Sequence, residues 1–353
     1  MRWTVAAILA ALLVGCTGPS VWTDVLVDAT ADSLAVTDTG VLVGGHRDTA
    51  PYLAQLDGSS PVPITLQPGD PYAASATLVA LGVDGDRRYA LGTAIGGAHS
   101  NARWSTWMGS ATELPSYPQT FFTFGGHDAG PLLGVTTLDH QPIIVGIRTT
   151  STGMRAAIYT ARGTKWSPLA PEAALSSDRG RELSFTAITK AGDQLALVGD
   201  ELLLTPDLPQ TPTIWVGRPG DWQQVRLPVP DGITGAGPSW ATAVSCDPQS
   251  CWVAGWAHGR PVAWRVGLPD LAVTTTALLD GTTTDTTTKA LVTMSDGHPV
   301  VATNGDNATV QVGCGASWRS LGTPGSVQAL VATTSGVYAI SGGRVRFLPT
   351  PHC

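Results

Sequence analysis

Short apolar stretches alternate with turns rich in Gly and Asp along almost the whole chain, and this alternation repeats. The first half of each repeat unit is an apolar strand, a turn, and a second strand that ends in small residues. Seven copies of this half are visible. They lie at residues 33–45, 77–93, 132–147, 184–200, 240–256, 289–304 and 327–342. A period of roughly 40 to 55 residues with four strands per unit is typical of a β-propeller. The pattern predicts an all-β fold, a single seven-bladed β-propeller.

The second half of several units carries a tryptophan at a fixed place. In 156–171, 213–228 and 308–324, a third strand is followed by a Gly-containing turn, a tryptophan and a short fourth strand that ends at proline. The second and fifth units match this half less well, so six or eight blades are also compatible with the sequence. A solenoid is disfavoured, because it would need atypical capping repeats at both ends.

The last unit is incomplete, because its third strand at 344–349 is followed by only four residues. Its missing fourth strand should begin with a tryptophan, and the segment 21–27 provides one at Trp22. Pairing of this segment with the last unit would remove the free edge that an open ring exposes. We therefore expect residues 21–27 to be the outer strand of blade 7, in one propeller domain that spans 21–353.

The N-terminus has the layout of an export signal. One arginine precedes an apolar run that ends in small residues at Gly15. The run is about 13 residues long, whereas a membrane-spanning helix needs about 20. Its end, Leu-Val-Gly-Cys, resembles the lipobox of bacterial lipoproteins. The resemblance implies a signal peptide at 1–15, lipidation of Cys16, a tether at 16–20, and an exported protein held on the outer face of the cell membrane.

The composition favours a β-rich fold and argues against a nucleic-acid partner. Charged residues make up 13% of the chain, which also contains 41 Gly and 26 Pro. Few charges and many turn-forming residues favour strands joined by tight connections. The formal net charge is −7, and no cluster of Lys and Arg is present. A nucleic-acid partner is therefore not expected, because phosphate binding needs such clusters.

Some of the turns before tryptophan resemble degenerate Asp boxes, the Ser-x-Asp-x-Gly-x-x-Trp turns of sialidase-like BNR-repeat propellers. In residues 159–166, Gly163 and Trp166 match the motif, while Tyr159 and Ala161 stand in place of its serine and aspartate. The resemblance extends over the chain after Cys16, to secreted actinobacterial propellers and photosystem II assembly-factor propellers. It concerns architecture and turn chemistry, so it implies a fold and not an activity.

Apart from Cys16, four cysteines remain, and four cysteines in an exported protein allow three disulfide pairings. Cys246 and Cys251 flank the turn between the first two strands of blade 5, so they face each other across a hairpin. Cys314 and Cys353 then pair by elimination. Propeller topology places both at the bottom of neighbouring blades 6 and 7. A zinc site is the competing interpretation, but neither the spacing nor the compartment favours it.

Polar residues recur in the loops that a propeller presents on its top face, between second and third strands and between blades. These candidate binding residues are His46, Arg47, Asp48, His99, Arg103, Arg148, Asp200, Glu201, His258, Arg260, Asn304, Asp306 and Arg344. The three histidines occupy equivalent positions, which raises the possibility of a metal site. We expect instead that they are solvated loop residues, because such loops can lie far apart, and we predict no metal or other cofactor.

The longest connection between blades, 115–131, is unusually aromatic. It contains Tyr117, Phe121, Phe122 and Phe124, in a place where polar residues are normal. Aromatic residues in such a loop indicate either a lid packed on the central funnel or an exposed contact patch. The four side chains are therefore added to the candidate binding residues, with both alternatives open.

The sequence favours binding over catalysis. No nucleophile elbow, HExxH, P-loop or nucleotide-binding fingerprint occurs in a usable context. A sialidase would need three arginines, a tyrosine paired with glutamate, and an acidic aspartate, and no motif of that family surrounds the arginines here. We predict a membrane-anchored, non-enzymatic envelope scaffold for a protein or glycan partner, with no catalytic residues assigned. The alternative is a carbohydrate-active envelope enzyme, a sialidase-like glycosidase or a lyase.

Overall fold

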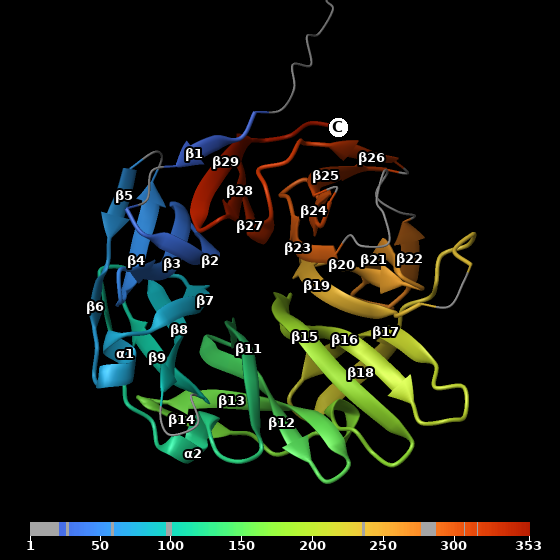
Figure 1. Ribbon diagram of the computed structural model, residues 1–353, viewed down its shortest axis with the longest axis horizontal. Helices are drawn as coiled ribbons and strands as arrows, with labels where there is room; N and C mark the ends of the chain where they lie inside the picture. Colours follow the sequence, from blue (N-terminus) through green and yellow to red (C-terminus); the bar gives the residue numbers. More distant parts are fainter. Residues whose placement is uncertain are drawn as a thin grey trace, which may run out of the picture.

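The protein is a seven-bladed β-propeller. The computed structural model describes residues 21–25, 28–57, 60–96, 101–234, 237–276, 287–306, 308–315 and 317–353. In this part of the chain, seven sheets of three or four strands surround a central axis, and Figure 1 shows them as the blades of a ring. The fold class and the blade number predicted from the repeat are confirmed. No helix among the described residues has the length and apolar character needed to cross a membrane.

The first four blades follow one another along the chain. Blade 1 contains β2 (Thr30–Thr37), β3 (Gly40–Arg47), β4 (Ala50–Asp57) and β5 (Ser60–Pro63). Blade 2 contains β7 (Thr77–Asp84), β8 (Arg87–Gly96) and β9 (Asn101–Gly109). Blade 3 contains β11 (Ala129–Leu138), β12 (Gln141–Thr150), β13 (Gly153–Arg162) and β14 (Lys165–Pro168). Blade 4 contains β15 (Arg181–Ala191), β16 (Gln194–Leu203), β17 (Gln210–Arg218) and β18 (Asp221–Arg226).

The remaining blades complete the ring. Blade 5 contains β19 (Trp240–Cys246), β20 (Ser250–Ala257), β21 (Arg260–Gly267) and β22 (Val273–Thr276). Blade 6 contains β23 (Thr287–Thr293), β24 (Pro299–Asn304), β25 (Thr309–Cys314) and β26 (Ser317–Ser320). Blade 7 contains β27 (Val327–Thr333), β28 (Gly336–Ser341), β29 (Arg344–Pro349) and β1 (Thr23–Val25). We call the face that carries the turns between second and third strands the top face.

Short elements between the blades complete the chain. They are β6 (Thr65–Gln67), α1 (Pro71–Ala74), β10 (Glu113–Pro115), α2 (Phe121–Phe124) and the 3-10 helix η1 (Ala173–Leu175). Strands β6 and β10 pair in parallel with each other, outside the blades. Figure 1 shows α1 beside β9 and α2 beside β14, both at the outer rim of the ring.

The ring closes through the N-terminal strand, as the incomplete last repeat predicts. β1 pairs antiparallel with β29, with Thr23 opposite Phe347 and Val25 opposite Val345. The Trp22 indole donates a hydrogen bond to the Leu321 carbonyl of blade 6 (2.9 Å), which ties the closing strand to the neighbouring blade. Residues 26 and 27 of the predicted strand lie outside the described residues.

Each first strand carries a β-bulge at an equivalent position. The register shifts occur at Ala31/Ser33, Leu78/Ala80, Leu132/Gly134, Phe185/Ala187, Ala241/Ala243, Thr288/Ala290 and Val327/Ala329. A bulge bends the strand and increases its twist. It also brings the inner strand close to the second strand, so that a Cβ on Gly199 would lie 1.9 Å from the Ser184 carbonyl oxygen. The small residues that end several second strands in the sequence follow from this close approach.

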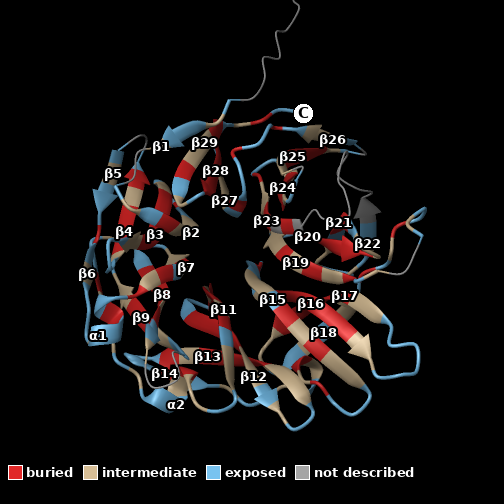
Figure 2. Cartoon of the chain, viewed as in Figure 1, coloured by how far each residue is buried: buried red, intermediate tan, exposed pale blue. Residues whose placement is uncertain are grey.

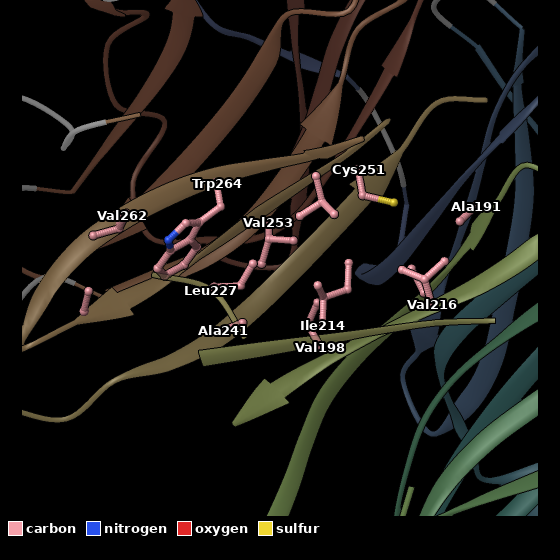
Figure 3. Close-up of a cluster of buried hydrophobic side chains, with 13 residues drawn as sticks. Ala191, Val198, Ile214, Val216, Leu227, Ala241, Cys251, Val253, Val262 and Trp264 are labelled. Atoms are coloured by element: carbon pink, nitrogen blue, oxygen red, sulfur yellow. The ribbon is translucent and has the colours of Figure 1, made fainter. Parts of the chain in front are cut away.

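Apolar side chains between adjacent blades form the core. Figure 3 shows the cluster between blades 4 and 5, in which Val198 and Ile214 face Val253 and Trp264. All four side chains are completely buried. Burial of each such side chain contributes about 1.5–3 kcal/mol. Figure 2 shows the same distribution around the ring, with buried residues inside the blades and exposed residues at α1, α2 and the outer turns.

Both predicted disulfides are present. Cys246 and Cys251 are bonded across the turn between β19 and β20, with their Cα atoms 4.0 Å apart. Cys314, at the end of β25, is bonded to Cys353, four residues beyond β29, with a Cα separation of 5.4 Å. The second bond joins blade 6 to the end of the chain on the bottom face. It therefore lies beside the junction that β1 closes.

Candidate functional site

The top face of blade 1 holds a histidine and a carboxylate in contact. His46 Nδ1 lies 3.2 Å from Asp32 Oδ2, and Asp32 is the extra residue of the bulge in β2. Burial raises the pKa of the Asp32 carboxyl, and the contact with His46 offsets part of that rise. Arg47 forms an ion pair with Asp28 (3.5 Å), and Asp48 occupies the turn with a φ of 52°.

In blade 4 the two predicted carboxylates reach the top end of β16, but both are buried. Asp200 accepts hydrogen bonds from the Ser184 hydroxyl and from Gln210 Nε2 (2.9 Å to the latter). Glu201 accepts from Arg226 Nε (2.5 Å) and Arg181 Nη1 (3.3 Å). These contacts leave the two carboxylates inside the blade, where they stabilise it. The prediction that Asp200 and Glu201 are exposed on a binding surface is therefore wrong.

The Glu201 carboxyl links blade stability to pH. Burial raises the pKa of Glu201, but hydrogen bonds from Arg226, Gln224 and Arg181 outweigh it and hold the pKa below its ordinary value of 4.5. A group with a lowered folded-state pKa stabilises the fold above its unfolded-state pKa and loses that contribution as pH falls through the folded-state pKa.

We predict that Glu201→Gln lowers the free energy of unfolding by about 2 kcal/mol at neutral pH. The difference from wild type should shrink as the pH falls from about 6 to about 3, since wild type then loses the charged carboxylate. Urea denaturation across this range measures it. Asp207→Asn, at an exposed position of the same blade, is the control. A difference independent of pH would show that the charge is not the source of the effect.

Two other predicted residues, Asn304 and Arg148, hold neighbouring elements together through hydrogen bonds to the backbone. Asn304 accepts from the Val327 amide and donates to the Val327 carbonyl, which joins blades 6 and 7. Arg148 donates to the Phe122 and Thr123 carbonyls (3.2 Å each) and so holds α2. Arg344 pairs with Asp24, and Arg260 and Asp306 are exposed. His258 lies in the β20–β21 turn, and His99 is outside the described residues.

The described residues contain no group of three or more His, Cys, Asp or Glu side chains that could hold a metal ion. His46 is engaged with Asp32, whereas the His258 amide donates a hydrogen bond to Ser239 Oγ (2.9 Å). The structure therefore brings the histidines of blades 1 and 5 to the top face without bringing them together.

The aromatic connection 115–131 lies at the outer rim between blades 2 and 3, and not over the central funnel. Gln119 donates to the Thr164 carbonyl (2.9 Å) and accepts from the Trp166 amide (3.0 Å), which fixes the connection to blade 3. Phe124 is buried against Tyr159, with ring centroids 5.1 Å apart. Of the two alternatives left open by the sequence, a lid on the funnel is excluded by this position.

Two aromatic side chains of the connection remain exposed. Phe121 is 52% exposed and Phe122 is 76% exposed, and their rings meet edge to face with centroids 5.2 Å apart. Tyr117 is half-buried on the outer side of β9, where its amide donates to the Thr106 carbonyl (3.2 Å). The exposed pair therefore projects from a rigid base formed by Phe124 and Gln119.

A groove runs between this pair and blade 2. Two hollows of about 470 and 630 Å³ meet here and share lining residues. We call it the rim groove and define it by Tyr72, Arg103, Trp104, Phe121 and Phe124. The Arg103 guanidinium lies 4.8 Å from the Phe121 ring centroid and 5.8 Å from that of Tyr72. Its Nε is buried without a partner, and no hydrogen bond or ion pair joins the Arg103 side chain to another described residue.

Sequence reasoning identified Arg103 and the phenylalanines but missed Tyr72 and Trp104. Tyr72 lies on α1, which begins where Asp70 caps the helix: Asp70 Oδ1 accepts from the Tyr72 and Ala73 amides (2.8 and 2.9 Å). Aspartate followed by proline is a recognised helix-start signal and could have placed this turn. Trp104 gave no signal, because a tryptophan on a third strand is equally compatible with the core.

Comparisons with known proteins agree on the fold. No protein-family model and no curated protein matches the sequence. Among solved structures, YCF48 from Cyanidioschyzon merolae is similar with a TM-score of 0.59 and 12% identity, over 94% of this chain and 98% of that one. The β-propeller domain of the Trilobed protease from Pyrococcus furiosus gives 0.53 and 11%, over 91% and 93%. A polysaccharide lyase of family PL25, an ulvan lyase, gives 0.50 and 10%, over 96% of each chain.

These similarities define the class of protein, a β-propeller. At identities of 10 to 12% they show the fold alone. The similar structures include both enzymes and a protein whose name states no activity, so function must be argued from the site.

Proposed function

We propose that this protein is a non-enzymatic binding module of the cell envelope, with the rim groove as its partner site. The observation that carries the proposal is Arg103, whose guanidinium contacts the rings of Tyr72 and Phe121 in an aromatic groove and has no ion-pair partner among the described residues. Tyr and Arg side chains are enriched in binding hot spots. The exposed Phe121 and Phe122 beside them add an apolar surface of the kind that marks interaction sites.

The anchor belongs to the same proposal. We infer that Cys16 carries a lipid and that the short tether at 16–20 holds blade 7 near the membrane. β1 runs antiparallel to β29, so its N-terminal end lies toward the bottom face, where Cys314 and Cys353 are bonded. The rim groove lies along the upper half of β9 in blade 2. Figure 1 shows blade 1 between this blade and the closing strand β1. In this arrangement the groove lies toward the top face, whereas the anchor lies at the bottom face, so the groove is accessible to an envelope partner.

One observation favours a second candidate, an enzyme that acts on carbohydrate. Asp32 and His46 form a carboxyl–imidazole pair on the top face, and burial raises the pKa of Asp32, as in many acid–base catalysts. The ulvan lyase shows that this fold can act on a polysaccharide. Turnover of a glycan panel by purified protein, abolished in Asp32→Asn, would favour this candidate over the binding module.

We predict that Phe121→Ser combined with Phe122→Ser lowers recovery of a crosslinked envelope partner at least tenfold, because the variant removes the exposed apolar surface of the groove. The measurement is quantitative pull-down from crosslinked membranes. Leu204→Ser with Leu208→Ser is the matched control, since these leucines are also exposed, at 46% and 55%, but lie in blade 4. Equal recovery with both double variants would contradict a partner site at the rim groove.

A further inference from the structure

Blade 2 differs from the other six blades in its outer strand. Each of the others has four paired strands, whereas the sheet of blade 2 contains only β7, β8 and β9 among the described residues. The segment 113–117 lies along the lower half of β9 only: the Ser110 amide donates to the Glu113 carbonyl, and a bridge joins Trp107 to Ser116. Within this segment, β10 pairs in parallel with β6. After Tyr117 the chain leaves β9 and continues to α2. The upper half of β9, residues 101–105, therefore has no described strand on its outer side.

The backbone groups on this free edge can be identified. The Thr106 carbonyl points outward, because it accepts from the Tyr117 amide. Outward and inward groups alternate along an antiparallel strand. The amides and carbonyls of Ala102 and Trp104 therefore also point outward, and no strand in the described part of the chain pairs with β9 there. Ala102 is exposed, so this edge is accessible.

The side chains around the edge differ between the two faces of blade 2. Arg103 and Tyr72 lie together on one face, beside α1. Trp104, the next residue along β9, packs on the opposite face, in the cluster that contains Phe124 and Tyr159. An added strand would alternate in the same way, with one side chain toward Arg103 and its two neighbours toward the aromatic cluster.

Three polar side chains in or beside the groove are already occupied. Asp70 caps α1, Ser116 Oγ accepts from the Gly69 amide, and Gln119 bonds to Tyr117, Thr164 and Trp166. A glycan would bury hydroxyl groups that need such partners, and unpaired buried polar groups are costly. The groove offers instead aromatic surface, one cation and an open strand edge, and these fit a peptide.

We propose that an extended peptide segment of a partner protein adds an outer strand to the upper half of β9, antiparallel to it, beyond the point where residues 113–117 leave the blade. An Asp or Glu of the segment pairs with Arg103, and the residues before and after it are apolar. The carboxylate comes from a side chain within the segment, because the groove continues on both sides of Arg103, toward Tyr72 and toward Gly130. Main-chain hydrogen bonds supply affinity and alternate side chains supply specificity. The inference rests on the proposed function of the rim groove and names the chemistry of its partner.

Selection from a display library of random ten-residue peptides, with both ends capped, tests the motif. Enriched peptides should share one acidic residue between two apolar residues. Binding measured by fluorescence polarisation should weaken at least tenfold when the acid is replaced by its amide, and by the same factor in Arg103→Met, with partial recovery in Arg103→Lys. Thermal melting of each variant checks that it is folded. Enriched peptides that bind Arg103→Met as well as wild type, or no enrichment, would overturn the proposal.

Hydrogen exchange tests the strand itself. The amides of Ala102 and Trp104 should become protected when an enriched peptide is bound, whereas the amide of Arg103, which points inward, should not change. N-methylation along the peptide should weaken binding at every second position only. Unchanged exchange at Ala102 and Trp104 would contradict strand addition.

The outcomes separate this inference from the proposed function. If Phe121→Ser with Phe122→Ser still removes the envelope partner but no peptide motif depends on Arg103, the groove is a binding site and strand addition is wrong. A glycan-array signal that the same double variant abolishes would likewise show a binding site without strand addition. If neither the partner nor peptides depend on the groove, both proposals fail.

Discussion

Replacement of Cys314 and Cys353 by serine is expected to lower the free energy of unfolding by about 4 kcal/mol, the largest effect we predict for any pair of side chains. The bond closes a loop with a sequence separation of 39 residues, so its removal restores much conformational freedom to the unfolded chain. The crosslink also joins blade 6 to the end of the chain beside the closing strand β1. Urea denaturation of the double-serine variant, compared with oxidised wild type, measures the difference.

The other disulfide provides the matched control. Cys246 and Cys251 are only five residues apart in sequence, so their replacement by serine should cost about 2 kcal/mol. If the two double variants lost equal stability, the contribution of the longer bond would not arise from loop closure, and its role in securing the ring would be wrong.

Gly199→Val is expected to destabilise the protein by at least about 3 kcal/mol or to prevent folding. Gly199 lies opposite the bulge of β15, where an added Cβ would approach the Ser184 carbonyl oxygen to 1.9 Å. The position of the added Cβ is fixed by the backbone at residue 199, and the oxygen belongs to the backbone of Ser184. No side-chain rotation can therefore relieve the contact. Thermal unfolding monitored by circular dichroism, together with the yield of folded protein, gives the readout.

Gly180→Ala is the control for this substitution, because the nearest atom to its added Cβ, Asp178 Oδ1, lies 3.4 Å away. It should change the melting temperature only slightly. A melting temperature of Gly199→Val within a degree or two of wild type would mean that β16 can move away from β15, and that the bulge does not dictate the small residues of the repeat.

Most of the fold could be predicted from the sequence because a propeller repeats one simple pattern. Alternating apolar residues and turns located the blades, and the unpaired third strand at the C-terminus indicated that Trp22 begins the closing strand. The same topology put Cys314 and Cys353 on one face, which the disulfide confirms. These features depend on local periodicity and connection order, both of which can be read along the chain.

The candidate site was harder to predict, because it depends on contacts between distant segments. Topology placed Glu201 on the top face, but its burial depends on arginines of β15 and β18, some twenty residues away on either side. The sheet of blade 2 has three paired strands, and β10 pairs instead with β6, which follows blade 1: Glu113 lies opposite Thr65, 48 residues earlier in the chain. In the sequence, the only sign of this pairing is that the second half of the second unit matches the repeat pattern less well than the others do.

In our interpretation, the rim groove is the surface through which this propeller binds its partner. The most direct measurement places a photo-crosslinking amino acid at Phe122, and separately at the exposed apolar control position Leu208, in the full chain expressed in intact cells. We expect a discrete crosslinked partner from position 122, lost when Arg103→Met is added, and none from position 208. A partner captured at position 208 but not at 122 would contradict the assignment of the rim groove.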